Sequence, residues 1–207
     1  MLDSIRCNAM VIDSADNIYL VGEGSSAIVL IKCNSSGSKL WERIWDSSRY
    51  DWVDDVCVDS QDNICIAGNY GYDMLVIKYN SSGEELWYRT WAQVTHQYGR
   101  AIDTDSNDSI YIGGVMDTYY PEFIERNLIL LKYDSLGYLE WEEICKEGDG
   151  TVCYDMCIDS NNYIFLSGNL LEGDVQEYVY ISIYDWQGNH LWNETWGDSI
   201  KSYGGGN

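Results

Sequence analysis

The chain has few basic residues. Its 207 residues include 12 lysines and arginines against 34 aspartates and glutamates, which gives a formal net charge of −22 at pH 7. A protein with this field repels polyanions, so we exclude nucleic acid and anionic membrane surfaces as partners. Such a surplus of carboxylates is typical of a solvated surface. Two more specific explanations are adaptation to high salt and cation binding, and the sequence does not favour one of these two over the other.

The sequence also lacks a long apolar run. No stretch approaches the roughly 18 residues that a membrane span needs, so we expect no membrane insertion. The first residues, MLDSIRCNAMVID, do not show the basic and then hydrophobic segments of a secretory leader. The sequence therefore assigns no compartment.

Residues that carry chemistry are scarce. The two histidines, His96 and His190, lie far apart in the sequence, and neither is arranged with a Cys or Ser as a nucleophile pair. No glycine-rich segment joins a strand to a helix in the manner of a phosphate-binding loop. We therefore expect a protein that is not an enzyme and that holds no cofactor.

The sequence contains one unit that is repeated four times. Each copy has an aspartate–serine turn, an apolar strand ending in glycine, a second apolar strand, a second turn and a tryptophan. Successive tryptophans are 46, 54 and 51 residues apart, a period typical of repeat arrays. We treat 1–207 as one domain with repeats at about 1–46, 47–92, 93–146 and 147–207. The anchors are Asp13, Asp59, Asp105 and Asp159; Gly22, Gly68, Gly114 and Gly168; and Trp41, Trp87, Trp141 and Trp192.

Each repeat is predicted to form four short β-strands. In the second copy, runs rich in β-branched and aromatic residues cover 55–59, 64–68, 73–79 and 85–91, separated by Asp, Asn, Ser and Gly. The links are short enough to require antiparallel hairpins. Four sequential antiparallel strands per repeat, with no helical segment between them, predict an all-β chain built of β-propeller blades.

The tryptophans are expected to pack one blade against the next. Trp41, Arg43 and Trp45 fall on one face of their strand by its two-residue period. Because such positions recur with the repeat, we favour packing over a platform for a carbohydrate or cofactor.

The seven cysteines include no C-x-x-C pair and have no regular spacing, which argues against a zinc site or a disulfide framework. Most of them stand where another repeat carries an apolar residue, so we expect buried, unreactive thiols. Free thiols favour a reducing or anaerobic setting. The cysteines are Cys7, Cys33, Cys57, Cys65, Cys145, Cys153 and Cys157.

The repeat resembles a known family. The pattern D-S-x-D-N-I-Y-x-x-G, then x-L-x-x-K-Y-x-S-x-G-x-x-x-W, is similar to the bacterial and archaeal β-propeller repeats labelled SBBP. The G-x-x-x-W ends at 37–41, 83–87, 137–141 and 188–192 are also similar to quinoprotein-type propeller repeats. The fourth copy departs with Ile183 at the lysine position and Tyr163 at an asparagine position. Resemblance to the SBBP family implies an extracellular or surface propeller, usually of unassigned activity, with no catalytic residues to carry over.

Both ends of the sequence stand in the same register of the repeat. Residues 3–6 (DSIR) match residues 198–201 (DSIK). Since propellers hold four to eight blades, we expect part of a larger propeller, or a half that self-associates with a second copy. A closed four-bladed ring is the alternative.

The loops differ between copies. From the repeat glycine to the lysine position there are 10 residues in the first two copies, 18 in the third and 15 in the fourth. These connections and the links between blades are expected on one face of the propeller, and insertions there often mark binding. Exposed aromatics among carboxylates suit a protein or glycan partner. We therefore predict a non-catalytic recognition or scaffold module, with candidate residues Trp52, Asp54 and Asp55 in a link and Tyr119, Tyr120, Glu122 and Phe123 beside the single proline, Pro121.

The alternative function is a calcium-dependent binding domain, or a fragment of a propeller enzyme whose active residues lie outside this chain. The turns at 13–17 and 59–63 gather the oxygen side chains that hard cations prefer, but they lack the distal bidentate carboxylate of an EF-hand loop. Turns capped by their own Asx side chains are favoured over metal sites. The alternative metal ligands are Asp13, Asp16, Asp59 and Asp62.

Overall fold

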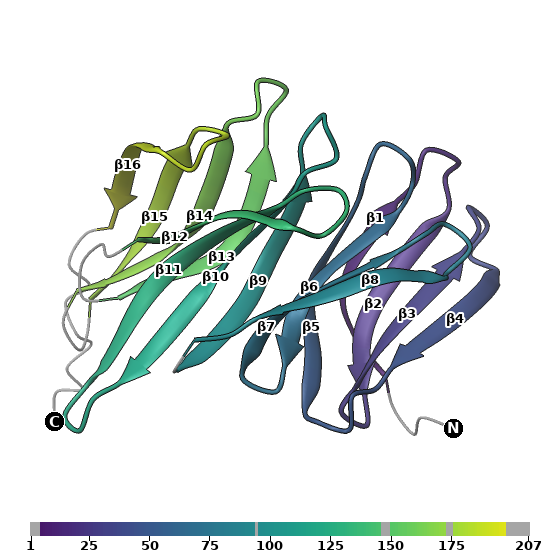
Figure 1. Cartoon of the computed structure of the whole chain (residues 1–207), viewed down its shortest axis with the longest axis horizontal. Coiled ribbons are helices and arrows are strands. Elements are labelled where there is room, and N and C mark those ends of the chain that lie inside the picture. The colour runs from purple at the N-terminus through teal and green to yellow at the C-terminus, as the bar shows by residue number, and fades with distance from the viewer. Residues whose placement is uncertain (1–4, 94, 146–149, 173–175, 198–207) are drawn as a thin grey trace, which may run out of the picture.

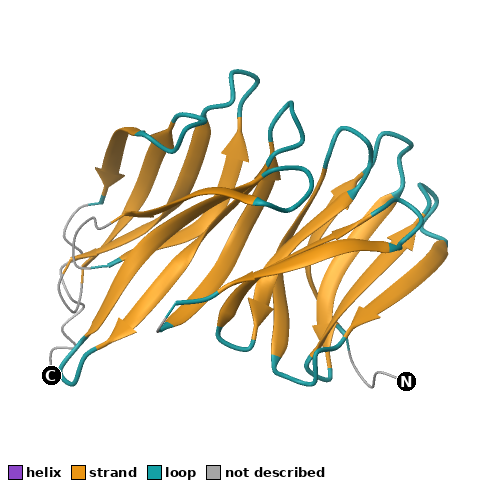
Figure 2. Cartoon of the chain, in the orientation of Figure 1, coloured by secondary structure: helices purple, strands orange, loops and turns teal. Residues whose placement is uncertain are grey.

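The computed structural model describes residues 5–93, 95–145, 150–172 and 176–197. These residues form sixteen strands, arranged as four antiparallel sheets of four strands each, and none of them is helical. In every sheet the strands are hydrogen-bonded in chain order, so each sheet is a simple meander (Figure 2). The prediction of four-stranded propeller blades is therefore confirmed. The described ranges contain no helix that could span a membrane.

The four sheets are named blades 1 to 4. Their strands are β1 (Arg6–Ile12), β2 (Ile18–Gly24), β3 (Ala27–Cys33) and β4 (Lys39–Trp45) in blade 1; β5 (Asp51–Val58), β6 (Ile64–Tyr70), β7 (Asp73–Tyr79) and β8 (Glu85–Trp91) in blade 2; β9 (His96–Thr104), β10 (Ile110–Tyr119), β11 (Ile124–Tyr133) and β12 (Leu139–Cys145) in blade 3; and β13 (Thr151–Ile158), β14 (Ile164–Glu172), β15 (Gln176–Tyr184) and β16 (His190–Trp196) in blade 4.

The blades stand side by side in an open row, from blade 1 at one end to blade 4 at the other (Figure 1). Strand β1 packs against β5, β5 against β9, and β9 against β13, so the first strand of each blade is the innermost. Within the described residues, β1 and β13 do not pack against each other. These residues therefore do not form the closed four-bladed ring that was the alternative. We call the side of a blade that faces the preceding blade its leading face, and the opposite side its trailing face.

The aspartate turns form as the sequence predicts. In blade 1 the Asp13 carboxylate accepts hydrogen bonds from the backbone N–H groups of Ala15 and Asn17, over 3.0 and 2.8 Å. The fourth turn residue, Asp16, has a left-handed backbone with a φ of 61°, which aspartate and asparagine tolerate. The same bonds and the same φ recur in the other three blades. The Asx side chain thus caps its own hairpin.

The repeat glycine is required by a β-bulge in the innermost strand. In blade 2 the register shifts between Val53 and Asp55, which leaves Asp54 as the extra residue. The bulge brings the backbone of β5 close to β6, so that a Cβ added at Gly68 would lie 2.2 Å from the carbonyl oxygen of Trp52. Each of the other blades has the same bulge opposite its glycine. The bulge residues are Asn8, Asp54, Arg100 and Tyr154.

Apolar clusters fill the three junctions between blades. At the first junction, Tyr19 and Leu30 on the trailing face of blade 1 join Val53 and Ile66 on the leading face of blade 2. Matching clusters lie between blades 2 and 3 and between blades 3 and 4. The prediction that the tryptophans pack between blades is confirmed for those that contact or belong to these clusters, whereas two tryptophans of blade 4, Trp192 and Trp196, are exposed. The packed tryptophans are Trp41, Trp45, Trp87, Trp91 and Trp141.

All seven cysteines are free thiols. The prediction of burial holds for Cys57, Cys65, Cys145 and Cys153, whereas Cys33 is half-buried. It is wrong for Cys7 and Cys157, which are exposed. Cys7 lies on the leading face of blade 1 and Cys157 on the trailing face of blade 4, the two blade faces outside the three junctions.

Candidate binding face

The links that lead into blades 2 and 3 lie on the same face of the propeller as the turns between the second and third strands of blades 1 and 2. The Asp51 N–H, at the start of β5, donates to the Ser26 carbonyl in the β2–β3 turn over 3.2 Å. The Gln97 N–H, near the start of β9, donates to the Tyr72 carbonyl in the β6–β7 turn over 2.8 Å. The links before blades 2 and 3 are thus each fastened to the turn of the preceding blade, as the sequence predicts.

A continuous series of aromatic rings crosses this face over blades 2 and 3. Trp52 contacts Tyr50 edge-on at a centroid distance of 5.9 Å and stacks on Tyr98 at 6.1 Å. Tyr98 shares a hydrogen bond with Tyr119, and burial together with that bond raises the pKa of Tyr98 to about 12. The series continues through His96, which lies 4.8 Å from Tyr119 and 4.0 Å from Tyr72. We call Tyr50, Trp52, Tyr72, His96, Tyr98 and Tyr119 the aromatic strip.

A cleft of about 530 Å³ opens beside Trp52. Its walls come from the innermost strands of blades 1 to 3, with Asn8 of β1, Asp54 of β5 and Arg100 of β9 all reaching it. All three are bulge residues. The extra residue of a bulge points its side chain in a new direction, and this is why these side chains reach the cleft. The remaining lining residues are Arg6, Cys7, Glu23, Tyr50, Trp52 and Val53.

The charges in the cleft are balanced. Arg100 forms an ion pair of 2.9 Å with Asp54, and its guanidinium lies 5.4 Å from the centre of the Tyr98 ring. Burial raises the pKa of the Asp54 carboxyl, and the positive charge of Arg100 opposes that rise. Among the described residues, Asp54 Oδ2 and Arg100 Nε have no hydrogen-bond partner. With Arg6 and Glu23, the lining holds two guanidinium groups and two carboxylates, so it offers hydrogen-bonding atoms without favouring either charge.

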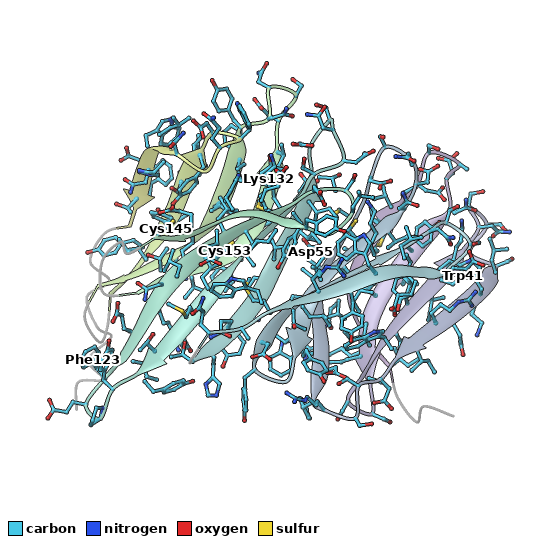
Figure 3. The ribbon with its side chains drawn as sticks, viewed as in Figure 1. Trp41, Asp55, Phe123, Lys132, Cys145 and Cys153 are labelled. Carbon is cyan, nitrogen blue, oxygen red and sulfur yellow. The ribbon has the colours of Figure 1, made fainter. Side chains whose placement is uncertain are left out.

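The structure brings together three of the predicted partner-binding residues. Trp52 and Asp54 line the cleft, and Tyr119 belongs to the aromatic strip. Asp55 lies between blades 2 and 3, where its carboxylate accepts the N–H of Ile102 over 2.9 Å (Figure 3). Burial raises the pKa of Asp55, and the bonds from backbone N–H groups counteract it. We therefore leave Asp55 out of the binding face.

The other predicted residues stand at the tip of the β10–β11 hairpin. Tyr120 and Phe123 stack on each other at 4.7 Å, and Glu122 is exposed between them. Phe123 lies at the far end of the hairpin, well away from Asp55 (Figure 3). The insertion thus contributes Tyr119 to the strip, whereas its tip forms a separate aromatic pair.

Sequence reasoning missed Tyr50, Tyr72, His96, Tyr98 and Arg100. One signal was available for Arg100. The residue five positions before each turn aspartate is Asn, Asp, Arg or Tyr in the four copies, within a strand that is otherwise largely apolar. A polar position that varies within a conserved repeat unit marks a side chain outside the core.

The alternative cation ligands are engaged in structural contacts. Besides its turn bonds, Asp13 lies 3.4 Å from Lys32 Nζ, and Asp59 forms a 2.9 Å ion pair with Lys78. Asp62 accepts two hydrogen bonds from Ser14 of the preceding blade, whereas Asp16 is exposed. In the described part of the chain, no three His, Cys, Asp or Glu side chains are grouped as metal ligands.

Calcium is therefore expected to stabilise the protein no more than magnesium does. The aspartate oxygens already accept N–H and ammonium hydrogens, and a cation would have to displace those donors. We expect calcium and magnesium at about 5 mM to give melting temperatures within about 1 °C of each other. Differential scanning calorimetry measures both. A calcium-specific rise of several degrees would establish the cation-binding alternative.

Comparisons with known proteins support the fold alone. No protein-family model and no curated protein matches the chain. The lignostilbene dioxygenase of Pseudomonas brassicacearum is similar with a TM-score of 0.55 at 11% identity, over 94% of this chain and 51% of that one. Extracellular domains 1–2 of Drosophila Semaphorin 1b give 0.46 at 9% identity, over 88% and 40%. A chain from the complex of Drosophila Plexin A with Semaphorin 1b gives 0.30 at 7% identity, over 90% and 55%.

The chain thus spans about half the length of the solved structures that it matches. The first similarity, together with the four blade-shaped sheets, defines the class of protein: this chain has a β-propeller fold.

Proposed function

We propose that this chain is a non-catalytic recognition module that binds a protein or glycan partner through the aromatic strip and the adjoining cleft. The observation that carries the proposal is the strip itself, a run of ring contacts that joins two blades on the face of the links. Tyr50, Tyr72 and Tyr119 are exposed along it. Large aromatic side chains on a rigid scaffold are the usual anchors of binding surfaces.

The chemistry of the cleft indicates the kind of ligand. Trp52 and Tyr98 offer stacked ring surface, on which the apolar face of a sugar or a peptide side chain can pack. Asp54 and Arg100, whose side chains are 21% and 36% exposed, add a carboxylate acceptor and guanidinium donors to the lining of the cleft. Because the two guanidinium groups are matched by two carboxylates, the cleft suits a polar ligand with little net charge, such as a neutral oligosaccharide or a peptide backbone.

Removing exposed rings of the strip is expected to weaken recognition without unfolding the protein. Tyr72→Ala and Tyr119→Ala should each weaken binding by about tenfold, since aromatic anchors contribute roughly 1–2 kcal/mol each. Their stability should change little, because both rings are exposed. The probes are a panel of neutral oligosaccharides and a displayed peptide library, with hits quantified by calorimetry on the wild-type chain.

Tyr138→Ala is the matched control, because Tyr138 is an equally exposed ring in the turn between β11 and β12, outside the strip. It should bind as the wild type does. Tyr120→Ala and Phe123→Ala test whether the hairpin tip also contacts the ligand. Unchanged affinity in both strip variants would reject the proposed face.

A further inference from the structure

The three junctions between blades repeat one contact. A tryptophan of the outermost strand covers the turn glycine of the following blade, and the left-handed φ of that glycine, 80–84°, recurs each time. The indole lies so close that a Cβ added to the glycine would meet its ring atoms. The pairs are Trp41 with Gly83, Trp87 with Gly137 and Trp141 with Gly188, at distances of 3.1, 2.8 and 3.2 Å from the added Cβ.

A second repeated contact joins the aspartate turns of neighbouring blades. Ser14 donates from its N–H and its hydroxyl to the Asp62 carboxylate, over 2.9 and 2.6 Å. Ser60 donates in the same way to Asp108, over 2.9 and 3.0 Å. At the third junction the Ser106 hydroxyl donates to the side-chain oxygen of Asn162 over 3.4 Å. Each junction therefore combines an inserting side, with its tryptophan and serine, and a receiving side, with its glycine and an aspartate or asparagine.

The two end blades expose one half of each contact. Blade 1 has the receiving side. A Cβ added at Gly37 meets nothing within 4 Å, so no indole covers this glycine. Asp16 is exposed, and its left-handed φ is the same as that of Asp62 and Asp108, which accept the serine hydrogen bonds in the interior blades. Blade 4 has the inserting side: Trp192 is 48% exposed, and Ser160 is exposed. The halves are complementary.

The apolar surfaces of the end blades are complementary too. On the leading face of blade 1, Met10 is 59% exposed, whereas the matching Val56 of blade 2 is 5% exposed. On the trailing face of blade 4, Trp196 is 53% exposed, whereas the matching Trp91 of blade 2 is 7% exposed. Large apolar side chains that are exposed at positions buried in the interior blades mark a candidate interaction site.

We propose that two copies of this chain associate head to tail, with the trailing face of blade 4 in one copy packed on the leading face of blade 1 in the other. The occupant is a second copy because the two faces match the two sides of the internal junctions. In this arrangement Trp192 covers Gly37 of the other copy, and Ser160 donates to its Asp16. Two copies supply eight blades, the upper end of the range in which propellers close, so the pair forms a ring.

The junction between copies most resembles the one between blades 3 and 4. Blade 4 has Glu194 at the position where Arg43 and Arg89 each donate to a turn carbonyl of the following blade. Blade 3 has Glu143 there, and its junction with blade 4 still packs fully. The absence of this arginine is therefore no obstacle to the association.

The net charge makes the association depend on salt. Each copy carries −22, so the long-range force between two copies is repulsive while the contact surfaces are apolar. Screening of exposed charges increases with ionic strength. The association should therefore tighten as sodium chloride is raised, whereas an interface held by ion pairs would weaken.

Sedimentation equilibrium on the full chain tests the proposal. We expect the wild type to have twice the mass of one chain, and Trp192→Glu and Met10→Glu each to have the mass of one chain with an unchanged circular dichroism spectrum. Leu136→Glu is the control, because Leu136 is exposed on a turn of an interior blade. It should remain a pair.

Mixing the two variants separates head-to-tail pairing from other arrangements. Trp192→Glu leaves the leading face of blade 1 unaltered, and Met10→Glu leaves the trailing face of blade 4 unaltered. An equimolar mixture should therefore form mixed pairs, although neither variant pairs alone. If the contact joined blade 4 to blade 4, Met10→Glu would pair normally and mixing would restore nothing. Maleimide labelling gives a second readout, since Cys7 and Cys157 should react slowly in the wild type and quickly in the variants.

The proposal is overturned if the wild type has the mass of one chain at every concentration and salt level. It is equally overturned if mass grows without limit, if Trp192→Glu still pairs, or if mixing the variants restores no pairs. None of these outcomes bears on the aromatic strip, which lies on blades 2 and 3.

Discussion

Gly114→Ala is expected to destabilise the protein by about 3 kcal/mol or more, the range of severe overpacking. A Cβ at this position would lie 2.2 Å from the carbonyl oxygen of Tyr98 and 2.4 Å from the Met74 methyl group. The carbonyl cannot move away, because the bulge at Arg100 fixes β9 against β10. Urea unfolding followed by circular dichroism measures the free energy of unfolding. The same clash recurs at Gly22, Gly68 and Gly168, so it is a property of the blade.

Gly113→Ala is the matched control, one residue away in the same strand. Its added Cβ would meet only side-chain atoms, the Cys153 sulfur at 3.0 Å and a Leu166 methyl group at 3.1 Å. Side-chain tips can shift by a few tenths of an ångström, so we expect a loss of about 1 kcal/mol. Equal losses from the two substitutions would show that the backbone clash at the bulge does not explain the repeat glycine.

The blades could be predicted from sequence because their causes are local. Alternation of apolar residues identifies strands, and a short link with an Asx residue requires a hairpin. The bounds predicted for β7 and β8 are therefore the observed ones, whereas β5 begins at Asp51 rather than at residue 55 and β6 ends at Tyr70 rather than at residue 68. The repeat glycines were visible as a pattern, yet their cause was not. The need for glycine depends on which residue of β5 lies opposite Gly68. The pairing register across a bulge cannot be predicted from the residues of either strand alone.

The binding face was only partly predictable. Trp52 and Tyr119 were found because a link and an insertion carry unusual aromatic residues. Tyr98 and His96 were not, because no insertion marks their segment and they become part of the strip only when blades 2 and 3 are packed together. Trp52 and Tyr119 themselves lie within β5 and β10, so the assignment of Trp52 to a link was wrong. A single strand position also separates Asp54, which lines the cleft, from Asp55, which caps a backbone N–H of blade 3.

The strip and the exposed blade faces are independent features of one architecture. In the proposed pair the end blades cover their exposed faces through a further junction, while the links of the interior blades stay free for a ligand. Pairing of two copies would place two aromatic strips on each assembly. Such an assembly would bind a multivalent partner more tightly than a single chain does, without any new contact to the ligand.

Lys78→Met is expected to lower the free energy of unfolding by about 3–5 kcal/mol, because it leaves a buried carboxylate without its counter-charge. Lys78 Nζ lies 2.9 Å from Asp59 Oδ2, and the two side chains are 3% and 0% exposed. The ammonium also donates to the Ser135 carbonyl of blade 3 over 3.4 Å, so it ties the aspartate turn to the next blade. Methionine keeps the length of the side chain and removes the charge, and urea unfolding measures the loss.

Lys39→Met provides the comparison at an exposed ion pair. Lys39 lies 2.6 Å from Glu42, with side chains 57% and 45% exposed, and its removal should change stability far less than Lys78→Met does, because water screens the pair. The fourth repeat already carries Ile183 at the lysine position, and its turn aspartate, Asp159, is only half-buried. Burial of the carboxylate therefore decides whether the lysine is needed. Similar small losses from Lys78→Met and Lys39→Met would mean that water reaches Asp59 and that the pair does not hold blades 2 and 3 together.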